Sequence, residues 1–276
     1  MSESEQGKGM SEEITQEECI FKKGRYPNTL FHYTKEKAAL WGILENNFKI
    51  SYARERIFGQ YEHVFFAAPM VSFCDLRLSE ATDHMRAYGN YGIGMTKEWA
   101  IKMHLNPVLY LSKMSHLTDT HIVSMGKFLR HIREEVVDSN EDERMTRVYH
   151  DLLNTYRISK NYEGDLIRKD GTIEHNYRFA NEREWRYVPA WESPFPGYVP
   201  LENIETDERK DHYNSLVGAA CLKFEPDDIR YLIIEDEHER DELIEHISNA
   251  KRGFDAPTVR RLSSRILTAT QINEDI

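Results

Sequence analysis

The 276-residue chain is 40% hydrophobic and 11% aromatic, which is enough for a packed core and excludes a disordered protein. Its 36 basic and 47 acidic residues give a net charge of −11, which disfavours non-specific binding to DNA or acidic lipid but allows a local basic groove. The longest apolar runs fall far short of the roughly 20 residues that cross a bilayer, so we expect no membrane-spanning or membrane-anchored segment.

The N-terminal sequence and the cysteines indicate an intracellular protein. Residues 1–20 are acidic and polar and lack the basic and apolar stretches of a secretory signal, so we expect a flexible acidic tail, followed by a single domain over 21–276. Cys19, Cys74 and Cys221 are odd in number and widely spaced, which favours a reducing compartment, and the cytoplasm fits. No histidine pair or Cys/His cluster has metal-ligand spacing, so we predict no metal site.

Strand signals are short and scattered rather than alternating regularly with helices, which favours an α+β fold over a doubly wound parallel sheet. Strands are expected at 28–33, 64–66, 71–74, 91–95, 108–111, 185–188 and 229–234. Helices are expected at 36–46, 79–87, 97–104, 116–133, 144–156 and 235–247. The acidic stretch 134–143 separates two of these helices, and 203–212 is predicted to be a solvated loop.

The first candidate motif is the run LFHYT, where a strand leads straight into a helix. In an extended segment His32 and Thr34 share one face, so an imidazole and a hydroxyl point the same way at the strand end and can hold a ribose or an amide. Thr34 also resembles a helix N-cap. Taken alone, the motif would equally suit a histidine at the edge of the core and a capping threonine.

The second motif is VSFCD, in which Ser72 lies on the opposite face from Phe73. Ser72 is a candidate to line a pocket, although an ordinary buried serine explains the pattern equally well. The glycines at 89, 92 and 94 have the wrong spacing for a dinucleotide-binding loop and precede a strand rather than a helix, which excludes a Rossmann fold.

The third motif is NEREWRYVP. If it forms a strand, Glu182, Glu184 and Arg186 share one face. Two carboxylates so close raise each other's pKa and can divide the roles of charge stabiliser and substrate-orienting base. The alternative is a charged run that forms a solvated face.

The order of these motifs, a histidine strand, a serine strand and an E-x-E strand, resembles the ADP-ribosyltransferase superfamily. More closely, the strings FHYTK, VSFCDL, DHMRAYGNYGIGMTKEW, NPVLYL and NEREWRYVP resemble the AbiGi family of abortive-infection proteins, from about Leu30 to the C-terminus. Families with a similar start and end resemble the DNA-modifying toxin DarT. The AbiGi family itself carries an antitoxin label.

The resemblance implies a split, curved, mostly antiparallel sheet flanked by helices, with NAD as substrate in the cleft between the sheet halves. It implies that His32 bonds the adenosine ribose, that Thr34 orients the same ribose or caps the helix, and that Ser72 braces the glutamate. Tyr91 or Phe73 would pack on the nicotinamide.

The two glutamates would be catalytic. Glu184 would bond the 2′-hydroxyl of the nicotinamide ribose and stabilise the positive charge that develops as the glycosidic bond breaks. Glu182 would orient or deprotonate the acceptor.

The resulting hypothesis is a NAD-dependent ADP-ribosyltransferase toxin of a phage-defence system, controlled by an antitoxin or regulatory protein encoded nearby. We expect its acceptor to be nucleic acid, RNA or DNA, held by a local basic rim. The candidates for this rim are Arg54, Arg56, Lys127, Arg130, Arg133 and Arg157. The alternative is a non-catalytic antitoxin that binds a toxin partner through a surface patch. A nuclease ranks third because no acidic metal constellation is visible.

Overall fold

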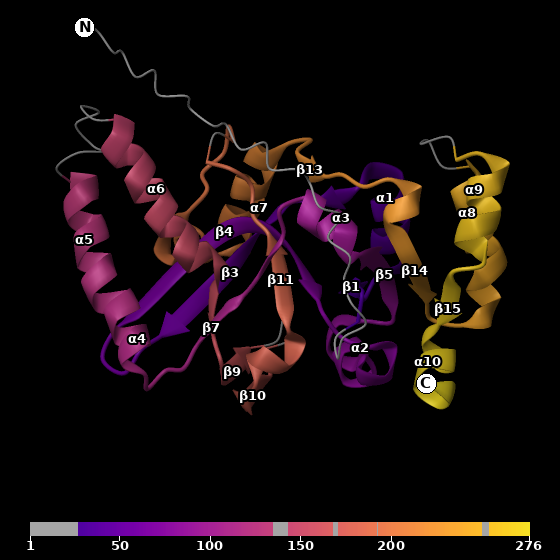
Figure 1. Ribbon diagram of the computed structural model, residues 1–276, viewed down its shortest axis with the longest axis horizontal. Helices are drawn as coiled ribbons and strands as arrows, with labels where there is room; N and C mark the ends of the chain where they lie inside the picture. Colours follow the sequence, from indigo (N-terminus) through magenta and orange to yellow (C-terminus); the bar gives the residue numbers. More distant parts are fainter. Residues whose placement is uncertain (1–26, 135–142, 168–170, 192, 250–253) are drawn as a thin grey trace, which may run out of the picture.

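The central feature of the molecule is a large open sheet (Figure 1). The computed structural model describes residues 27–134, 143–167, 171–191, 193–249 and 254–276. Across the sheet the strands follow in the order β15 (Ile266–Thr268), β14 (Ile229–Ile234), β5 (Tyr91–Thr96), β1 (Thr29–Thr34), β4 (His63–Cys74), β11 (Glu184–Tyr187) and β6 (Asn106–Pro107). Only β14 and β15 are parallel among these described strands, so the fold is α+β with a mixed, mostly antiparallel sheet.

The 12-residue strand β4 joins the two halves of the sheet. Over 63–70 it forms a hairpin with β3 (Ser51–Phe58), and it also pairs with β12 (Val199–Pro200). Over 71–74 it pairs instead with β11, while β1 meets it in register at Phe31 and Cys74. No other register pair joins these two strands in the described residues, and the gap between them beyond this pair, called the split here, is where the candidate site lies.

Helices gather at the two ends of the molecule, as Figure 1 shows. At one end are α4 (His116–Asp119), a π-helical turn (Thr120–Ser124), α5 (Met125–Ile132) and α6 (Glu143–Ile158). At the other are α8 (Arg240–Asn249), α9 (Ala256–Ser263) and α10 (Ala269–Asp275), while α1 (Lys37–Asn46), α2 (Thr82–Tyr88) and α3 (Lys97–Lys102) lie between them near β1 and β5. In the described part of the chain, no helix combines the length and the apolar character needed to cross a membrane.

The hydrophobic core has three parts that follow this layout. The largest contains Leu30 of β1 and the apolar faces of α1, α3 and α8. A second lies where Phe31 and Tyr33, on the other face of β1, pack against α2 and α10. The third packs Ile57 and Phe66 of the hairpin against α5 and α6. The alternation along β1 thus supplies two cores from one strand.

Three short two-stranded sheets complete the described part of the fold. One is the hairpin of β9 (Gly164–Ile167) and β10 (Ile173–Tyr177), and another pairs β2 (Phe48–Lys49) with β13 (Cys221–Leu222). The third is the parallel pair of β7 (Leu109–Leu111) and β8 (Ser159–Asn161), which brings Lys160 beside the main sheet.

The elements expected from the sequence are largely present. Each predicted strand overlaps an observed one, although 64–66 and 71–74 are parts of the single strand β4. Each predicted helix is also present, although 116–133 contains the π-helical turn. The expected tail, 1–20, and most of the acidic separator at 134–143 lie outside the described residues.

The prediction of a loop over 203–212 is wrong, because α7 (Asp207–Val217) begins there. Thr206 caps it by accepting a hydrogen bond from the Arg209 amide at 3.3 Å, and two acidic residues occupy the first turn, where the helix dipole favours them. The charged residues that suggested a loop form a solvated first turn of this helix, and its buried residue, Val217, comes only at its end.

Gly89 gives a test of the fold, because it caps α2 at a positive φ of 117° directly against the backbone that follows β1. A Cβ here would lie 2.2 Å from the Thr34 carbonyl oxygen and 2.4 Å from the Lys35 backbone. Gly89→Ala should therefore lower the free energy of unfolding by at least about 1–3 kcal/mol in urea titrations. Gly42→Ala in α1, where a Cβ meets nothing within 4 Å, should instead raise it by about 0.5–1 kcal/mol. Equal stability of the two variants would contradict this account.

Candidate functional site

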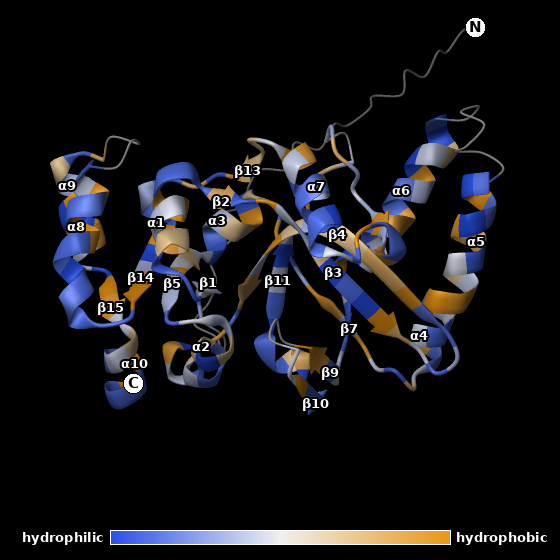
Figure 2. Ribbon diagram, turned by 180° about the vertical axis from the view of Figure 1, so that it is seen from behind, coloured by the Kyte–Doolittle hydropathy of each residue, from blue (hydrophilic) through white to orange (hydrophobic). Residues whose placement is uncertain are grey.

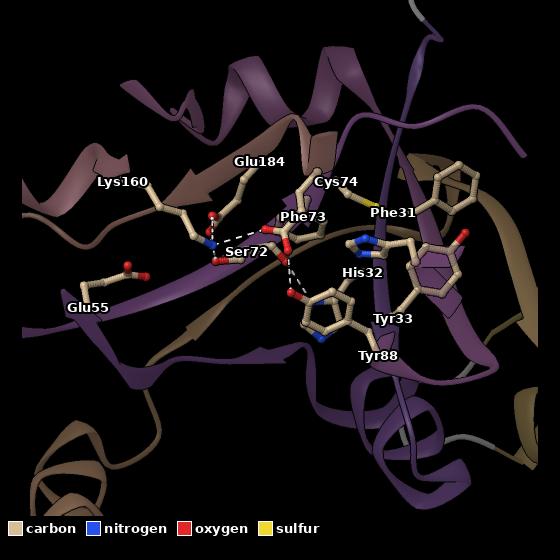
Figure 3. Close-up of a pocket in the computed structure, with 12 residues that line it drawn as sticks. Phe31, His32, Tyr33, Glu55, Ser72, Phe73, Cys74, Tyr88, Lys160 and Glu184 are labelled. Atoms are coloured by element: carbon tan, nitrogen blue, oxygen red, sulfur yellow. Dashed lines mark hydrogen bonds and ion pairs between the residues drawn. The ribbon is translucent and has the colours of Figure 1, made fainter. Parts of the chain in front are cut away.

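A pocket of about 240 Å³ opens where β1 and β4 part (Figure 3). One wall carries His32 and Tyr33 of β1, together with His84 and Tyr88 of α2. The other wall carries Ser72 of β4 and a group of charged side chains: Glu55, Lys160, Glu182 and Glu184. The lining is therefore aromatic on one side and ionic on the other.

His32 bridges the split in the sheet. Its Nδ1 lies 2.9 Å from the carbonyl oxygen of Ser72, so Nδ1 carries the proton and donates it to this bond. The ring packs against Phe48 and Phe73, and burial lowers the pKa of His32 more than the Ser72 carbonyl raises it. A hydrogen bond from the neutral imidazole thus takes the place of a backbone hydrogen bond between β1 and β4 at this point.

Glu184 is the centre of the ionic wall. One carboxylate oxygen accepts hydrogen bonds from the Ser72 hydroxyl at 2.7 Å and from Arg186 Nε at 2.7 Å. The other accepts from Lys160 Nζ at 3.1 Å and from Arg186 Nη2 at 3.0 Å. Burial disfavours ionisation, but Arg186 and Lys160 outweigh it and hold the pKa of Glu184 well below its usual range. With four donors, its lone pairs are fully used.

Glu182 reaches the same pocket from a 3-10 turn (Phe179–Glu182) rather than from the strand. The strand begins only at Glu184, because Arg183 adopts a left-handed conformation with φ 45°, so Glu182 and Glu184 do not share the face of one strand. Glu182 accepts hydrogen bonds from the hydroxyls of Tyr88 at 2.5 Å and Tyr177 at 3.0 Å, and from Lys160 at 3.1 Å.

Two cations hold the three carboxylates together. The Arg186 side chain has no exposed surface and also binds Glu55 through Nη2 at 2.8 Å. Burial alone would lower the pKa of Lys160, but Glu184, Glu182 and Glu55 raise it well above its usual value. Burial raises the pKa of Glu55 against the attraction of Arg186 and Lys160. The cluster is a closed ionic network.

The structure places five of the seven predicted site residues in this pocket: His32, Ser72, Phe73, Glu182 and Glu184. The other two lie elsewhere. Thr34 does not cap α1, whose N-cap is Glu36, and its hydroxyl accepts a bond from the Glu36 amide at 3.4 Å. Tyr91 begins β5, and its hydroxyl shares its proton between the carboxylates of Glu235 at 3.2 Å and Glu239 at 2.9 Å.

Sequence reasoning missed Lys160, Glu55, Tyr88 and Tyr177 as site residues. Lys160 belongs to the three-residue strand β8 and carries no motif that would mark it. In the part of the chain that the structure describes, no three His, Cys, Asp or Glu side chains are grouped to hold a metal ion.

Two of the six side chains expected in a basic rim, Arg157 and Arg54, are used inside the molecule. Arg157 is 1% exposed and bonds the Pro189 carbonyl, and Arg54 is tied to the Ile204 and Thr206 carbonyls and to Asp207. Arg157 therefore stabilises the interior, and Arg54 holds the start of α7 against β3. Arg56 lies on the hairpin, and Lys127, Arg130 and Arg133 belong to α5 and its C-cap.

Fold and site together define an α+β protein whose pocket, at the split of its sheet, holds a network of ion pairs. Comparison with known sequences gives its class, a phage-resistance protein. Residues 31–235 match the family model described as "Putative abortive phage resistance protein AbiGi, antitoxin". The chain belongs to the AbiGi family. It is 28% identical over 227 residues to the "Abortive phage resistance protein AbiGi" of Lactococcus lactis subsp. cremoris, covering 75% of this chain and 88% of that protein. No solved structure matches.

The hypothesis of a NAD-dependent ADP-ribosyltransferase toxin is therefore wrong, since the family is described as an antitoxin. The geometry gives a physical reason. A catalytic Glu184 would need a free carboxylate oxygen for the ribose 2′-hydroxyl, and both oxygens already accept two hydrogen bonds each. The findings support no enzymatic activity, and the comparisons do not show a relationship to DarT.

Lys160 should be essential for stability because it neutralises two buried carboxylates. Lys160→Met should lower the free energy of unfolding by about 3–5 kcal/mol, the usual effect of breaking a buried ion pair. Lys127→Met, at an exposed position of α5, should change it by no more than about 0.5 kcal/mol. Similar values for both variants in urea unfolding would show that the network contributes little.

The pocket histidines should make stability depend on pH. Burial lowers the pKa of His84 from 6.5 to about 4, so unfolding takes up a proton between these values. The stabilisation is complete above pH 6.5 and is lost as the pH falls toward 4. His84→Gln should flatten the slope of unfolding free energy by up to about 1.4 kcal/mol per pH unit in this window. Exposed His212 is the control, and His212→Gln should keep the wild-type slope. Unchanged slope in His84→Gln would refute the assignment.

Proposed function

We propose that this chain is the non-catalytic antitoxin of an abortive-infection system and that it acts by binding a toxin partner. The observation that carries the proposal is the match of residues 31–235 to a family described as an antitoxin. The relative from Lactococcus lactis subsp. cremoris, itself named an abortive phage resistance protein, supports the same biological setting.

The site chemistry supports a binding role over catalysis. Lys160 and Arg186 occupy the Glu184 carboxylate oxygens that a transfer reaction would need to bond the ribose. Without an ADP-ribosyl transfer reaction, the expected nucleic-acid acceptor has no role. A chain of net charge −11 also suits a protein partner better than a nucleic acid.

The proposal includes an ADP-ribosyltransferase-like fold, supported by the mostly antiparallel sheet and its split beside His32. NAD remains a prediction as a ligand of this pocket. Binding it in the expected orientation would require Lys160 to leave Glu184, so we expect at most weak binding without turnover.

Co-expression tests the proposal. Expression of this chain alone should leave growth unaffected, and expression with the protein of the adjacent gene should relieve the growth arrest that this second protein causes. Ser72→Ala and Glu182→Gln should protect as well as wild type, at matched expression, because protection needs no chemistry at the pocket. The proposal fails if this chain alone arrests growth and the purified protein releases nicotinamide from NAD.

A further inference from the structure

The outer half of the β3–β4 hairpin has a face that no described helix covers (Figure 2), whereas the inner half of this face packs against α7 through Tyr52 and Arg54. Arg56 lies opposite Phe65 and Phe58 opposite His63, so these four side chains share one face. Their neighbours point the other way, where Glu55 enters the pocket and Ile57 is fully buried. Figure 2 shows the outer half of the hairpin beside α4, with no helix drawn over it.

On this face aromatic rings contact one another, and two cations lie over them. The rings of Phe58, His63 and Phe65 form a cluster, in which His63 stacks on Phe65 with centroids 4.5 Å apart and Phe58 meets Phe65 edge to face with centroids 5.2 Å apart. The Arg56 guanidinium lies 6.0 Å from the Phe65 ring, and Lys113 Nζ lies 5.9 Å from the Phe58 ring. These contacts order the side chains while leaving Phe58 39% exposed.

The apolar surface continues around the tip of the hairpin. Tyr61 in the turn is 78% exposed, Met114, just before α4, is 67% exposed, and Leu117 of α4 is 63% exposed. The Gln60 amide donates to Asp119 at 3.1 Å, which fixes the turn against that segment. We call this surface the hairpin patch; it consists of Arg56, Phe58, Tyr61, Lys113, Met114 and Leu117. A cluster of large exposed apolar side chains typically marks an interaction site.

The charge of the hairpin patch is opposite to that of the whole chain. Among the described residues, no carboxylate lies within ion-pairing distance of Arg56 or Lys113, although the chain carries eleven more acidic than basic side chains. Both cations lie over rings instead. They are therefore available to pair with carboxylates of a partner.

We infer that the hairpin patch is the docking surface for the toxin partner, an inference that rests on the proposed function. The matching surface of the toxin is apolar at its centre, where it covers Phe58, Tyr61 and Met114, and carries carboxylates that reach Arg56 and Lys113. Aromatic residues, methionine and arginine are the side chains enriched at protein interfaces. Exposed Met114 and Leu117 favour protein over nucleic acid, because aliphatic side chains neither stack on bases nor bind phosphate.

The probe is the purified protein of the adjacent gene, titrated with this chain in a calorimeter. Phe58→Ala with Tyr61→Ala should weaken binding at least about tenfold, and Arg56→Glu with Lys113→Glu should do the same. These side chains are exposed, so all variants should keep the wild-type midpoint of unfolding. The matched controls are Ile101→Ala, which is 40% exposed, and Lys102→Glu, both on α3, and they should bind as wild type does.

The possible results distinguish failure of the proposed antitoxin function from failure of the docking surface alone. If wild type neither binds the probe nor protects cells, the proposed function fails, and the docking surface with it. If wild type binds and protects while both hairpin patch variants bind equally well, the toxin docks elsewhere and the inference alone is overturned.

Salt-sensitive binding of a single-stranded oligonucleotide that only the charge reversals abolish, with probe binding unchanged, would assign the patch to nucleic acid. Loss of a dimer in those variants, again with probe binding unchanged, would assign it to a second copy of the chain.

Discussion

The fully buried guanidinium of Arg186 is the interaction on which the arrangement of the pocket depends. An arginine without exposed surface is tolerated only when its charge and its donors are matched, and Glu184 and Glu55 supply this match from two strands. Because Arg186 and Glu184 belong to β11 and Glu55 to β3, the Arg186–Glu55 ion pair links these two strands, which both pair with β4. Lys160 then completes the balance from β8.

The network accounts for the state of the Glu184 carboxylate in this pocket. A carboxylate stabilises a developing positive charge only if its own charge is not already neutralised. Here Glu184 is held between two cations and a hydroxyl, so its charge contributes to the folded state. The order of the three sequence motifs locates the strands that meet at the pocket, whereas Lys160, a direct partner of Glu184, lies outside these motifs.

Much of the fold could be predicted from the sequence because its strands and helices carry strong local signals. The apolar run of β14 and the alternation in β1 are examples. The meeting of His32, Ser72 and Glu184 was also predictable, from motif order. Lys160 was not, since its place beside Glu184 depends on the parallel pairing of β7 with β8, and such long-range pairing leaves no local pattern. The full set of hydrogen bonds to Glu184 could not be predicted for the same reason, although the antitoxin role was already an alternative at the level of the sequence.

The alternation of side chains along β3 has a further consequence for how the protein can evolve. Glu55 faces the ionic network and Arg56 faces outward, so adjacent positions of one strand serve separate purposes. Substitutions at the outward positions can change the surface without disturbing the interior. Insertion or deletion of a single residue would exchange the two faces, because side chains alternate with a period of two. Divergence of this hairpin among relatives should therefore proceed by replacement of alternate residues at constant strand length.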